Sequence, residues 1–446
     1  MDTPPRLAVD RLLDDRETRI IVCCGAGGVG KTTTAAALGV RAAGRGRKAV
    51  VLTIDPARRL AQSMGIDSLD NTPRKVGTVG AGGGELHAMM LDMKRTFDEI
   101  VEAHADAERA RAILANPFYQ SLSAGFAGTQ EYMAMEKLGQ LRARDDWDLI
   151  IVDTPPSRSA LDFLDAPKRL GSFLDGKFIR VLMAPAKVGG RAGMKFLNVG
   201  MSMMTGTLSK LMGASLLKDV QTFVAAMDTM FGGFRTRADA TFRLLQAPGT
   251  AFLVVAAPEA DALREAAYFV ERLAAEKMPL AGLVLNRVHG SGADQLSAER
   301  ALAAAENLEE GGIVDQESGK AGLRDSGAEA TEPTETAETA GSADTARTAH
   351  SARTTRTTRT ANPPETGSPG TEGDTAVVDR ITAGLLRLHA ERMQVIAREQ
   401  RTRDRFTSLH PEVAVAEVAA LPGDVHDLAG LRAIGERLAA GVPAGA

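Results

Sequence analysis

The sequence predicts an α/β fold in which a mostly parallel sheet is covered by helices on both faces. A glycine-rich loop stands between an apolar strand and an Ala-rich helix within residues 20–38. Further short, continuous apolar runs alternate with helical stretches along the chain. Two of the runs end in acidic residues, Asp55 and Asp153. Continuous apolar strands between helices are typical of a parallel sheet that is buried on both sides.

The glycine-rich loop has the spacing of a complete phosphate-binding loop. Gly25 is followed by four residues and then by Gly30-Lys31-Thr32, and the strand before it and the helix after it are the context that this motif requires. Glycines let backbone N–H groups turn toward phosphate oxygens, and the start of the helix adds a partial positive charge. The pattern predicts a P-loop NTPase fold. In it, Lys31 reaches the β- and γ-phosphates and the Thr32 hydroxyl binds Mg²⁺. The loop residues expected to bind the nucleotide are Gly27, Gly28, Val29, Gly30, Lys31, Thr32 and Thr33.

The other elements follow in order along the chain. The apolar runs predict strands over residues 20–24, 49–54, 86–91, 149–152, 251–256, 283–285 and 413–418. A long charged helix is predicted over residues 377–405.

Two regions interrupt this alternation. Residues 166–245 are helical in tendency and rich in Met, and residues 290–375 have low complexity with almost no large apolar side chains. The second composition cannot bury enough surface to offset the entropy of ordering, so we expect disorder at its centre, about 310–374. The predicted organisation is a P-loop core over 1–289 with the helical insertion inside it, the low-complexity insertion over 290–375, and a helix–strand–helix segment over 376–446 that completes the core.

Composition excludes several classes of protein. The net charge of −4 over 446 residues does not favour nucleic acid as a partner. The two cysteines, Cys23 and Cys24, are adjacent on a strand, so their side chains point to opposite faces and are poorly placed to form a disulfide. They fit a reducing compartment. No signal-peptide pattern and no apolar run of membrane-spanning length is present. We therefore expect a cytoplasmic protein that is not an integral membrane protein.

The two strand-end carboxylates are candidates for chemistry. Asp153 ends a strand at the sheet edge where ligands of open α/β sheets bind, which predicts a Mg²⁺ role through water. The alternative is a helix-capping or turn Asp. Asp55 could orient or deprotonate an attacking water, but an Asp before Pro56 is also a common turn signal.

Three segments together resemble a known family. The phosphate loop, residues 53–57 (Thr-Ile-Asp-Pro-Ala) and residues 153–157 (Asp-Thr-Pro-Pro-Ser) are similar, in this order, to the anion-transporting ATPases. That family includes the arsenical pump-driving ATPase and the ATPase that targets tail-anchored membrane proteins. The resemblance covers about residues 1–290 and 376–446. It implies Mg²⁺-dependent ATP hydrolysis in a dimer, coupled to a switch-driven conformational change that serves anion or metalloid transport or protein targeting.

The resemblance also implies roles for single residues. Asp55 corresponds to the first switch, where the family's Asp activates water, and Asp153 begins the second switch, which responds to the γ-phosphate. Asn286 corresponds to the Asn that contacts adenine. Pro422 lies in a late loop expected against the base, and Pro258-Glu259 resembles a loop near the nucleotide and the dimer contact.

Departures from the family pattern leave alternatives open. Ala26 stands where the family usually has a lysine that reaches the partner's nucleotide, and Ser159 stands where it has a switch histidine. The family's zinc-binding and arsenite-binding cysteines are absent from the sequence. The chain is therefore expected to form a homodimer, or a heterodimer with a paralogous ATPase in which it is a low-turnover nucleotide-binding subunit.

The Met-rich region has two readings. Met suits adaptable apolar surfaces, so the region could bind a client or a membrane-protein partner. Met at helical spacing is also common in cores and dimer contacts. A third functional class, a partition-type ATPase on DNA or a membrane surface, would need a basic stripe or an amphipathic basic tail, and the C-terminal residues 438–446 offer neither.

Overall fold

The computed structural model describes residues 5–55, 59–77, 82–117, 119–120, 123, 129–155, 236–311 and 371–440. The chain divides into two compact units, one of residues 1–295 and 392–446 and the other of residues 296–391. Most of the Met-rich region lies outside the described residues, and its last part, 236–245, is helical. Residues 312–370 of the low-complexity region also lie outside them.

The first unit is built on a sheet whose described part has eight strands in the order β3-β4-β2-β5-β1-β6-β7-β8. All neighbouring pairs are parallel except β3 with β4, so the predicted mostly parallel sheet is confirmed. The strands are β1 (Ile20–Gly25), β2 (Lys48–Thr53), β3 (Arg74–Lys75), β4 (Glu85–Met90), β5 (Leu149–Asp153), β6 (Thr250–Ala256), β7 (Leu280–Val288) and β8 (Val415–Ala419). The sequence did not predict β3, because this antiparallel edge strand is two exposed basic residues long and carries no apolar pattern.

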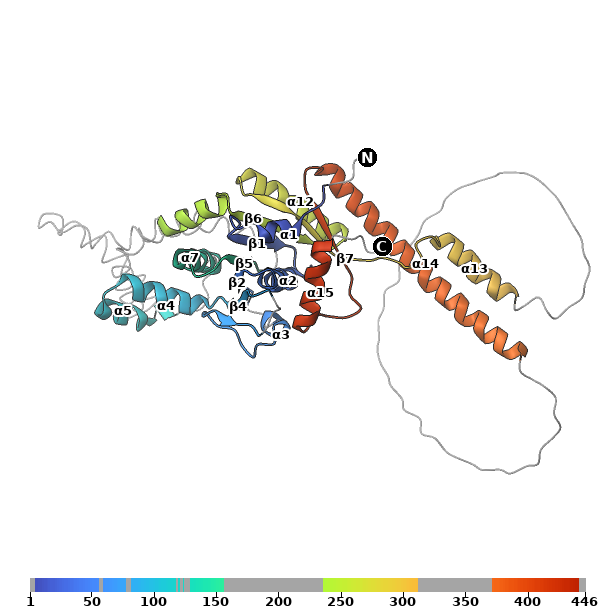
Figure 1. Ribbon diagram of the computed structural model, residues 1–446, viewed down its shortest axis with the longest axis horizontal. Helices are drawn as coiled ribbons and strands as arrows, with labels where there is room; N and C mark the ends of the chain where they lie inside the picture. Colours follow the sequence, from blue (N-terminus) through green and yellow to red (C-terminus); the bar gives the residue numbers. More distant parts are fainter. Residues whose placement is uncertain are drawn as a thin grey trace, which may run out of the picture. The chain divides into compact units, whose positions relative to one another are not determined.

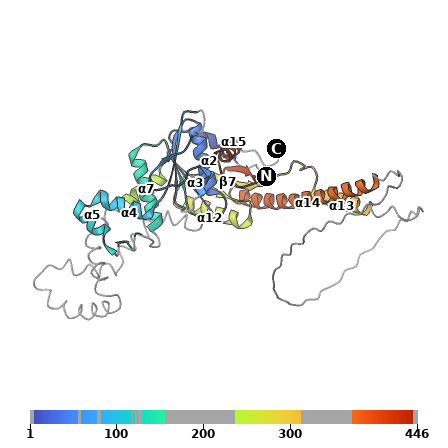
Figure 2. The ribbon, with the colours of Figure 1, turned by 90° about the horizontal axis from the view of Figure 1, so that it is seen from below.

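Helices cover both faces of this sheet, as Figures 1 and 2 show. One face carries α2 (Lys31–Gly44) and α15 (Leu428–Ala440), with α1 (Val9–Asp14) packed on α15 and α3 (Arg59–Ser63) packed on α2. The other face carries α12 (Ala260–Ala275) and α7 (Thr129–Arg144), and α4 (Met93–His104) lies between α7 and α5 (Ala107–Leu114). The predicted α/β class with helices on both faces is therefore confirmed.

The central strand β1 separates the two layers of the core. Ile20, Val22 and Cys24 belong to one buried cluster, whereas Ile21 and Cys23 belong to the other. Both cysteines are buried and free, and burial raises the pKa of both thiols. Opposite orientation on one strand thus explains why these neighbours act as small apolar core residues.

Parallel pairing brings the carboxyl ends of β1, β2 and β5 to one edge of the sheet. β1 pairs with β5 on one side and with β6 on the other, and β2 lies beyond β5. The chain leaves β1 through Gly25, where a Cβ atom would lie 2.0 Å from the Val255 carbonyl oxygen. Only glycine fits this close approach to β6, so the loop after β1 starts tight against the sheet.

A buried arginine ties the opposite edge of the sheet together. Arg47, just before β2, is 1% exposed. Its two terminal nitrogens donate to the carbonyl oxygens of Leu13 and Asp15 at 3.0 Å each, Thr18 at 2.7 Å and Asp148 at 2.5 Å. One side chain therefore satisfies carbonyl groups at the end of α1 and just before β1 and β5.

Because these carbonyls would lose their donors, we expect Arg47→Met to lower the free energy of unfolding by about 3–5 kcal/mol, the usual cost of breaking a buried charged network. Arg45→Met is the matched control, since it removes only surface ion pairs to Asp10 and Asp14 and should cost about 1 kcal/mol or less. Urea unfolding of both variants measures the difference. Equal losses would contradict the assigned role of Arg47.

The second unit contains α13 (Ala298–Gly311) and the part of α14 (Thr371–Leu409) that precedes Arg392. The two helices lie side by side, and Arg387 pairs with Glu309 at 2.5 Å. Four alanines that are at most 1% exposed form their core: Ala301, Ala305, Ala383 and Ala390. Helices thus occupy both ends of residues 290–375 and flank the centre for which disorder was expected. Alanine, a weak apolar signal in sequence, lets these helices pack closely.

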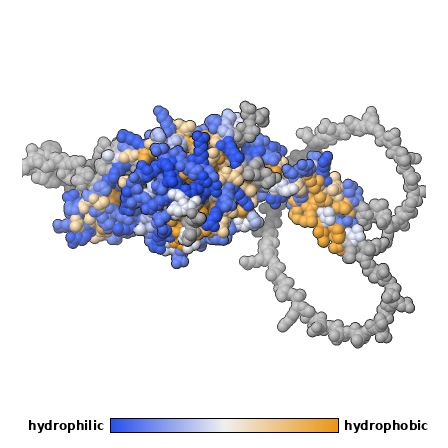
Figure 3. All heavy atoms as spheres, viewed as in Figure 1, coloured by the Kyte–Doolittle hydropathy of each residue, from blue (hydrophilic) through white to orange (hydrophobic). Residues whose placement is uncertain are grey.

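The first turns of α14 carry an exposed row of apolar residues, which contributes to the orange area over α13 and α14 in Figure 3. It consists of Val377, Val378, Ile381, Leu385 and Leu388, each about half exposed or more. No helix in the described part of the chain combines the length and the hydropathy that a membrane span requires.

Candidate nucleotide-binding site

The phosphate loop connects β1 to α2, and its last glycine fixes the shape of the loop. Gly30 caps α2 in the left-handed conformation, with φ of 94°. A Cβ atom there would lie 2.2 Å from Nδ2 of Asn286, and this Nδ2 donates to the Val29 carbonyl oxygen at 2.8 Å. Asn286 at the end of β7 therefore holds the loop directly, a contact that the sequence did not predict. Glycine at position 30 makes this contact possible.

Lys31 is buried beneath the loop. It is 6% exposed, and its Nζ donates to the Ala26 carbonyl oxygen at 2.7 Å. Burial lowers the pKa of Lys31, and the carboxylate of Asp153 opposes that shift. An ammonium group has three donors, so two remain for a ligand that enters the loop.

Asp153 lies at the centre of a small polar cluster. The hydroxyls of Thr32 and Thr53 donate to its Oδ2 at 2.7 and 2.8 Å. The carboxyl group is fully buried, and this burial raises its pKa to about 6 against the lowering effect of both hydroxyls and of Lys31. Within the described structure its Oδ1 has no hydrogen-bond partner.

The oxygens of this cluster fit a magnesium site. Mg²⁺ prefers hydroxyl, carboxylate and water oxygens. The Thr32 hydroxyl keeps its lone pairs after donating its proton, and the unpartnered Oδ1 of Asp153 is a buried acceptor that a metal-bound water could satisfy. Thr53 begins the segment 53–57 that carries the family resemblance, but no role was predicted for its hydroxyl, because a threonine in an apolar strand gives no signal beyond β-propensity.

Asp55 borders the same cavity as the loop. Its backbone N–H donates to the Thr53 hydroxyl at 3.2 Å, and its side chain is half-buried. The cavity has a volume of about 780 Å³ and is also lined by Gly28, Lys31 and Thr32. The charge of Asp55 raises the pKa of Asp153, so the two carboxylates lie within electrostatic range. The structure thus brings together the loop, Asp55 and the Thr32–Asp153 cluster.

A second cavity, of about 530 Å³, adjoins the first on the side of β7 and β8. It is lined by Asn286 and by Leu421 and Gly423. Pro422 between them is exposed and is not among the residues that line this cavity. Gly30 and Thr33 line both cavities, so the two form adjoining parts of one site. Its size suits a nucleotide.

Two charged residues of the site, Arg287 and Asp424, were not assigned by the sequence. Both line the two cavities. In the sequence, Arg287 directly follows Asn286, and this neighbourhood could have marked it as a residue of the site. A solvated arginine at the end of a strand has no pattern of its own, and only the structure shows where its side chain lies.

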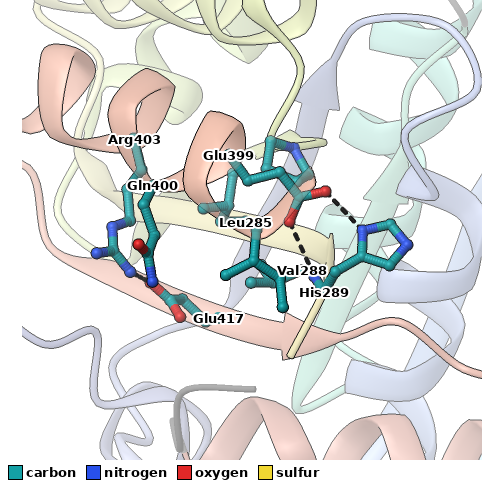
Figure 4. A pocket seen from close by; sticks show the side chains of 9 residues that line it. Leu285, Val288, His289, Glu399, Gln400, Arg403 and Glu417 are labelled. Carbon is teal, nitrogen blue, oxygen red and sulfur yellow. Dashed lines mark hydrogen bonds and ion pairs between the residues drawn. The ribbon is translucent and has the colours of Figure 1, made fainter. Parts of the chain in front are cut away.

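The segment after β7 is held by α14, as the close view in Figure 4 shows. Glu399 accepts hydrogen bonds from the His289 backbone N–H at 2.9 Å and from its ring Nδ1 at 2.5 Å. Beside this contact, Arg403 pairs with Glu417 at 2.8 Å. Pro258, which follows β6, lines the same small pocket. These contacts fix the segment that carries Asn286.

Comparison with known proteins adds family information to this geometry. Residues 18–310 match the family described as anion-transporting ATPase. The chain is 30% identical over 167 residues to ATPase GET3 of Malassezia globosa, a match that covers 37% of this chain and 47% of that protein. It is 26% identical over 298 residues to ATPase GET3 of Podospora anserina, covering 65% and 80% of the two chains.

A third relative carries a different name. The putative arsenical pump-driving ATPase of Halobacterium salinarum is 28% identical over 190 residues, which cover 40% of this chain and 28% of that protein. The match to the Malassezia protein likewise spans less than half of that relative.

Proposed function

The chain belongs to the anion-transporting ATPase family, and we propose that it binds ATP with Mg²⁺ at the phosphate loop and hydrolyses it. The observation that carries this proposal is that Lys31, Thr32 and Asp55 line one cavity, while the buried Asp153 accepts a hydrogen bond from the Thr32 hydroxyl. These are a cation, metal-ligand oxygens and a carboxylate, the groups that phosphoryl transfer to water requires.

In this proposal the phosphate tail is bound by positive groups at the start of α2. The loop N–H groups and the helix N-terminus attract phosphate oxygens. The two donors of Lys31 that do not bind Ala26 add a full positive charge. Because Lys31 is buried, its interaction with phosphate is screened little by water, and it would stabilise the charge that develops in the transition state.

Thr32 and Asp153 would hold the magnesium ion, Asp153 through water. Bound Mg²⁺ neutralises phosphate charge during transfer. The pKa of Asp153, raised to about 6 by burial, is still below neutrality, so the carboxylate is ionised at pH 7 to 8. The hydroxyls of Thr32 and Thr53 keep it oriented.

Asp55 is proposed to position the attacking water. It borders the cavity that contains the loop, and a carboxylate can orient water and accept its proton as the oxygen bonds to the γ-phosphorus. Hydrolysis would then relax the segments that begin at Asp55 and Asp153, the two switches that the resemblance implies.

A steady-state assay of phosphate release from ATP by the purified protein tests this function. We expect hydrolysis of ATP that requires Mg²⁺ and stops when EDTA is in excess over the metal. Release that is unchanged by EDTA, or equal to that of the Lys31→Met variant, would contradict the proposal.

Asn286 gives a further test of the site. We expect Asn286→Ala to weaken ATP binding about 10-fold, because the loop loses its hydrogen bond at Val29 and the side chain that packs on Gly30. Asn71→Ala removes a buried amide that is bonded to Thr96 and Glu99 of α4 and lines neither cavity, so it is the control for general destabilisation. Calorimetric titration measures both. An unchanged dissociation constant for Asn286→Ala would refute its role in the loop.

A second candidate function is favoured by Ala26. Its side chain is buried, at 8% exposure, and offers no charge to a partner's nucleotide. We propose that turnover of the chain alone is therefore slow and that a paralogous ATPase completes the catalytic pair. Turnover measured alone and with such a paralogue distinguishes this heterodimer from a homodimer.

The output of hydrolysis belongs to the same proposal. The family description and the name of one relative point to transport of anions or arsenicals, and the family resemblance adds protein targeting. The Met-rich residues 166–245 would contact a client or membrane-protein partner from the cytoplasm. Deleting residues 185–235 should then abolish partner recovery without loss of nucleotide binding.

A further inference from the structure

One residue of the site sits in an uncommon backbone conformation. In the pairing of β7 with β8, Asn286 lies opposite Val418 and Val288 lies opposite Ala419. Arg287 is thus an extra residue in β7, and its φ is +63°. A bulge of this kind next to a functional site turns one side chain away from the direction that the strand would give it.

The conformation of Arg287 is held from both sides. Before it, Asn286 is bound to the Val29 carbonyl oxygen at 2.8 Å. After it, Glu399 binds the His289 backbone (Figure 4), and Arg392 Nε donates to the Gly290 carbonyl oxygen at 2.7 Å. A non-glycine residue at positive φ persists only where its surroundings over-determine it. The bulge is therefore a built feature of the site.

The bulge places a cation between the two cavities. Arg287 lines the cavity of the phosphate loop and the cavity of Asn286. A molecule that extends from Lys31 to Asn286 must pass this shared region. Among the residues that line either cavity, Lys31 and Arg287 are the lysine and arginine members. In the described part of the chain Arg287 forms no ion pair, so its guanidinium is available to a ligand.

We propose that Arg287 binds the α-phosphate of the nucleotide and so positions it between the loop and the base. The inference rests on the proposed function, because it names a contact to the same ATP. Lys31 lies at the loop end of the site, where the β- and γ-phosphates are expected. The α-phosphate joins them to the ribose and the base, and this is the part of the molecule that the shared region would hold. A guanidinium suits phosphate oxygens through paired N–H donors.

Titration of wild type and variants with Mg-ATP and Mg-ADP tests this contact. Arg287→Ala should weaken the binding of both nucleotides by the same factor, about 10-fold. Arg287→Lys should recover part of the affinity, because it keeps the charge. Adenosine has no phosphate, so it should bind wild type and Arg287→Ala with equal affinity, as measured by competition with ADP. The control is Arg264→Ala, which removes an exposed arginine of α12 that pairs with Asp261 on the same helix.

The dependence of nucleotide affinity on salt distinguishes a charge contact from a purely structural role of Arg287. Because one charge pair is lost, the dissociation constant of Arg287→Ala should rise less steeply with NaCl than that of wild type. Equal affinity of wild type and Arg287→Ala would overturn the inference, as would an equal loss for adenosine or a Lys variant as weak as the Ala variant. If wild type itself binds neither ATP nor ADP, the proposed function fails as a whole.

Discussion

Lys31→Met is expected to reduce ATP hydrolysis at least about 100-fold, the usual cost of removing one preorganised donor to transition-state charge. Lys31 is buried and already directed by the Ala26 carbonyl, so little reorganisation is needed when phosphate enters. Methionine keeps the length and apolar stem of the side chain, so the core around α2 stays filled. Phosphate release at saturating Mg-ATP measures the effect.

The folding of this variant can be checked separately. Lys31→Met removes a buried charge, but it also leaves the Ala26 carbonyl oxygen without its donor. The thermal midpoint of the variant without nucleotide shows whether it still folds, and its stabilisation by ATP should be lost. Lys94→Ala, which removes a surface lysine of α4 paired with Asp98, should leave hydrolysis unchanged. Hydrolysis near the wild-type rate in Lys31→Met would contradict the assigned role.

Asp55→Asn is expected to separate binding from turnover. A positioned acid–base group contributes about 10²- to 10⁴-fold to a rate, so kcat should fall within that range. Asparagine keeps the size of the side chain but cannot accept the proton of water. Since Asp55 borders the cavity and the loop supplies the phosphate donors, the dissociation constant of ATP should change by less than about 3-fold.

For Asp55→Asn, a rapid single-turnover experiment measures the rate of hydrolysis, and an equilibrium titration measures the dissociation constant of ATP. Asp67→Asn is the matched control, because Asp67 is exposed and does not line the cavity. If Asp55→Asn lost ATP binding and hydrolysis together, Asp55 would be part of the binding site and not the group that activates water.

The sequence predicted the features that depend on local pattern. β1, the phosphate loop and α2 follow from apolar character and glycine spacing, and the strand ends at Asp55 and Asp153 follow from the same reasoning. Every strand inferred from an apolar run has a counterpart in the sheet. These signals are strong because parallel strands buried on both faces must be continuously apolar.

Features that depend on contacts between distant segments were not predicted. Asn286 and Val29 are 257 residues apart in the chain, and no pattern in either segment indicates their hydrogen bond. The Thr53 hydroxyl bond to Asp153 spans two strands, and the bulge at Arg287 depends on the register of β7 with β8. Such features arise from tertiary packing. The site in the structure therefore includes residues that the sequence motifs did not predict.

The proposed function requires that the start of α2 and the buried Lys31 bind the phosphate tail of ATP. Calorimetric titration of the purified chain with Mg-ATP measures this directly. We predict saturable binding of about one nucleotide per chain with a dissociation constant between roughly 1 μM and 1 mM, and loss of that signal in Lys31→Met. Absence of binding heat with folded wild-type protein above about 1 mM nucleotide, at two temperatures, would contradict it.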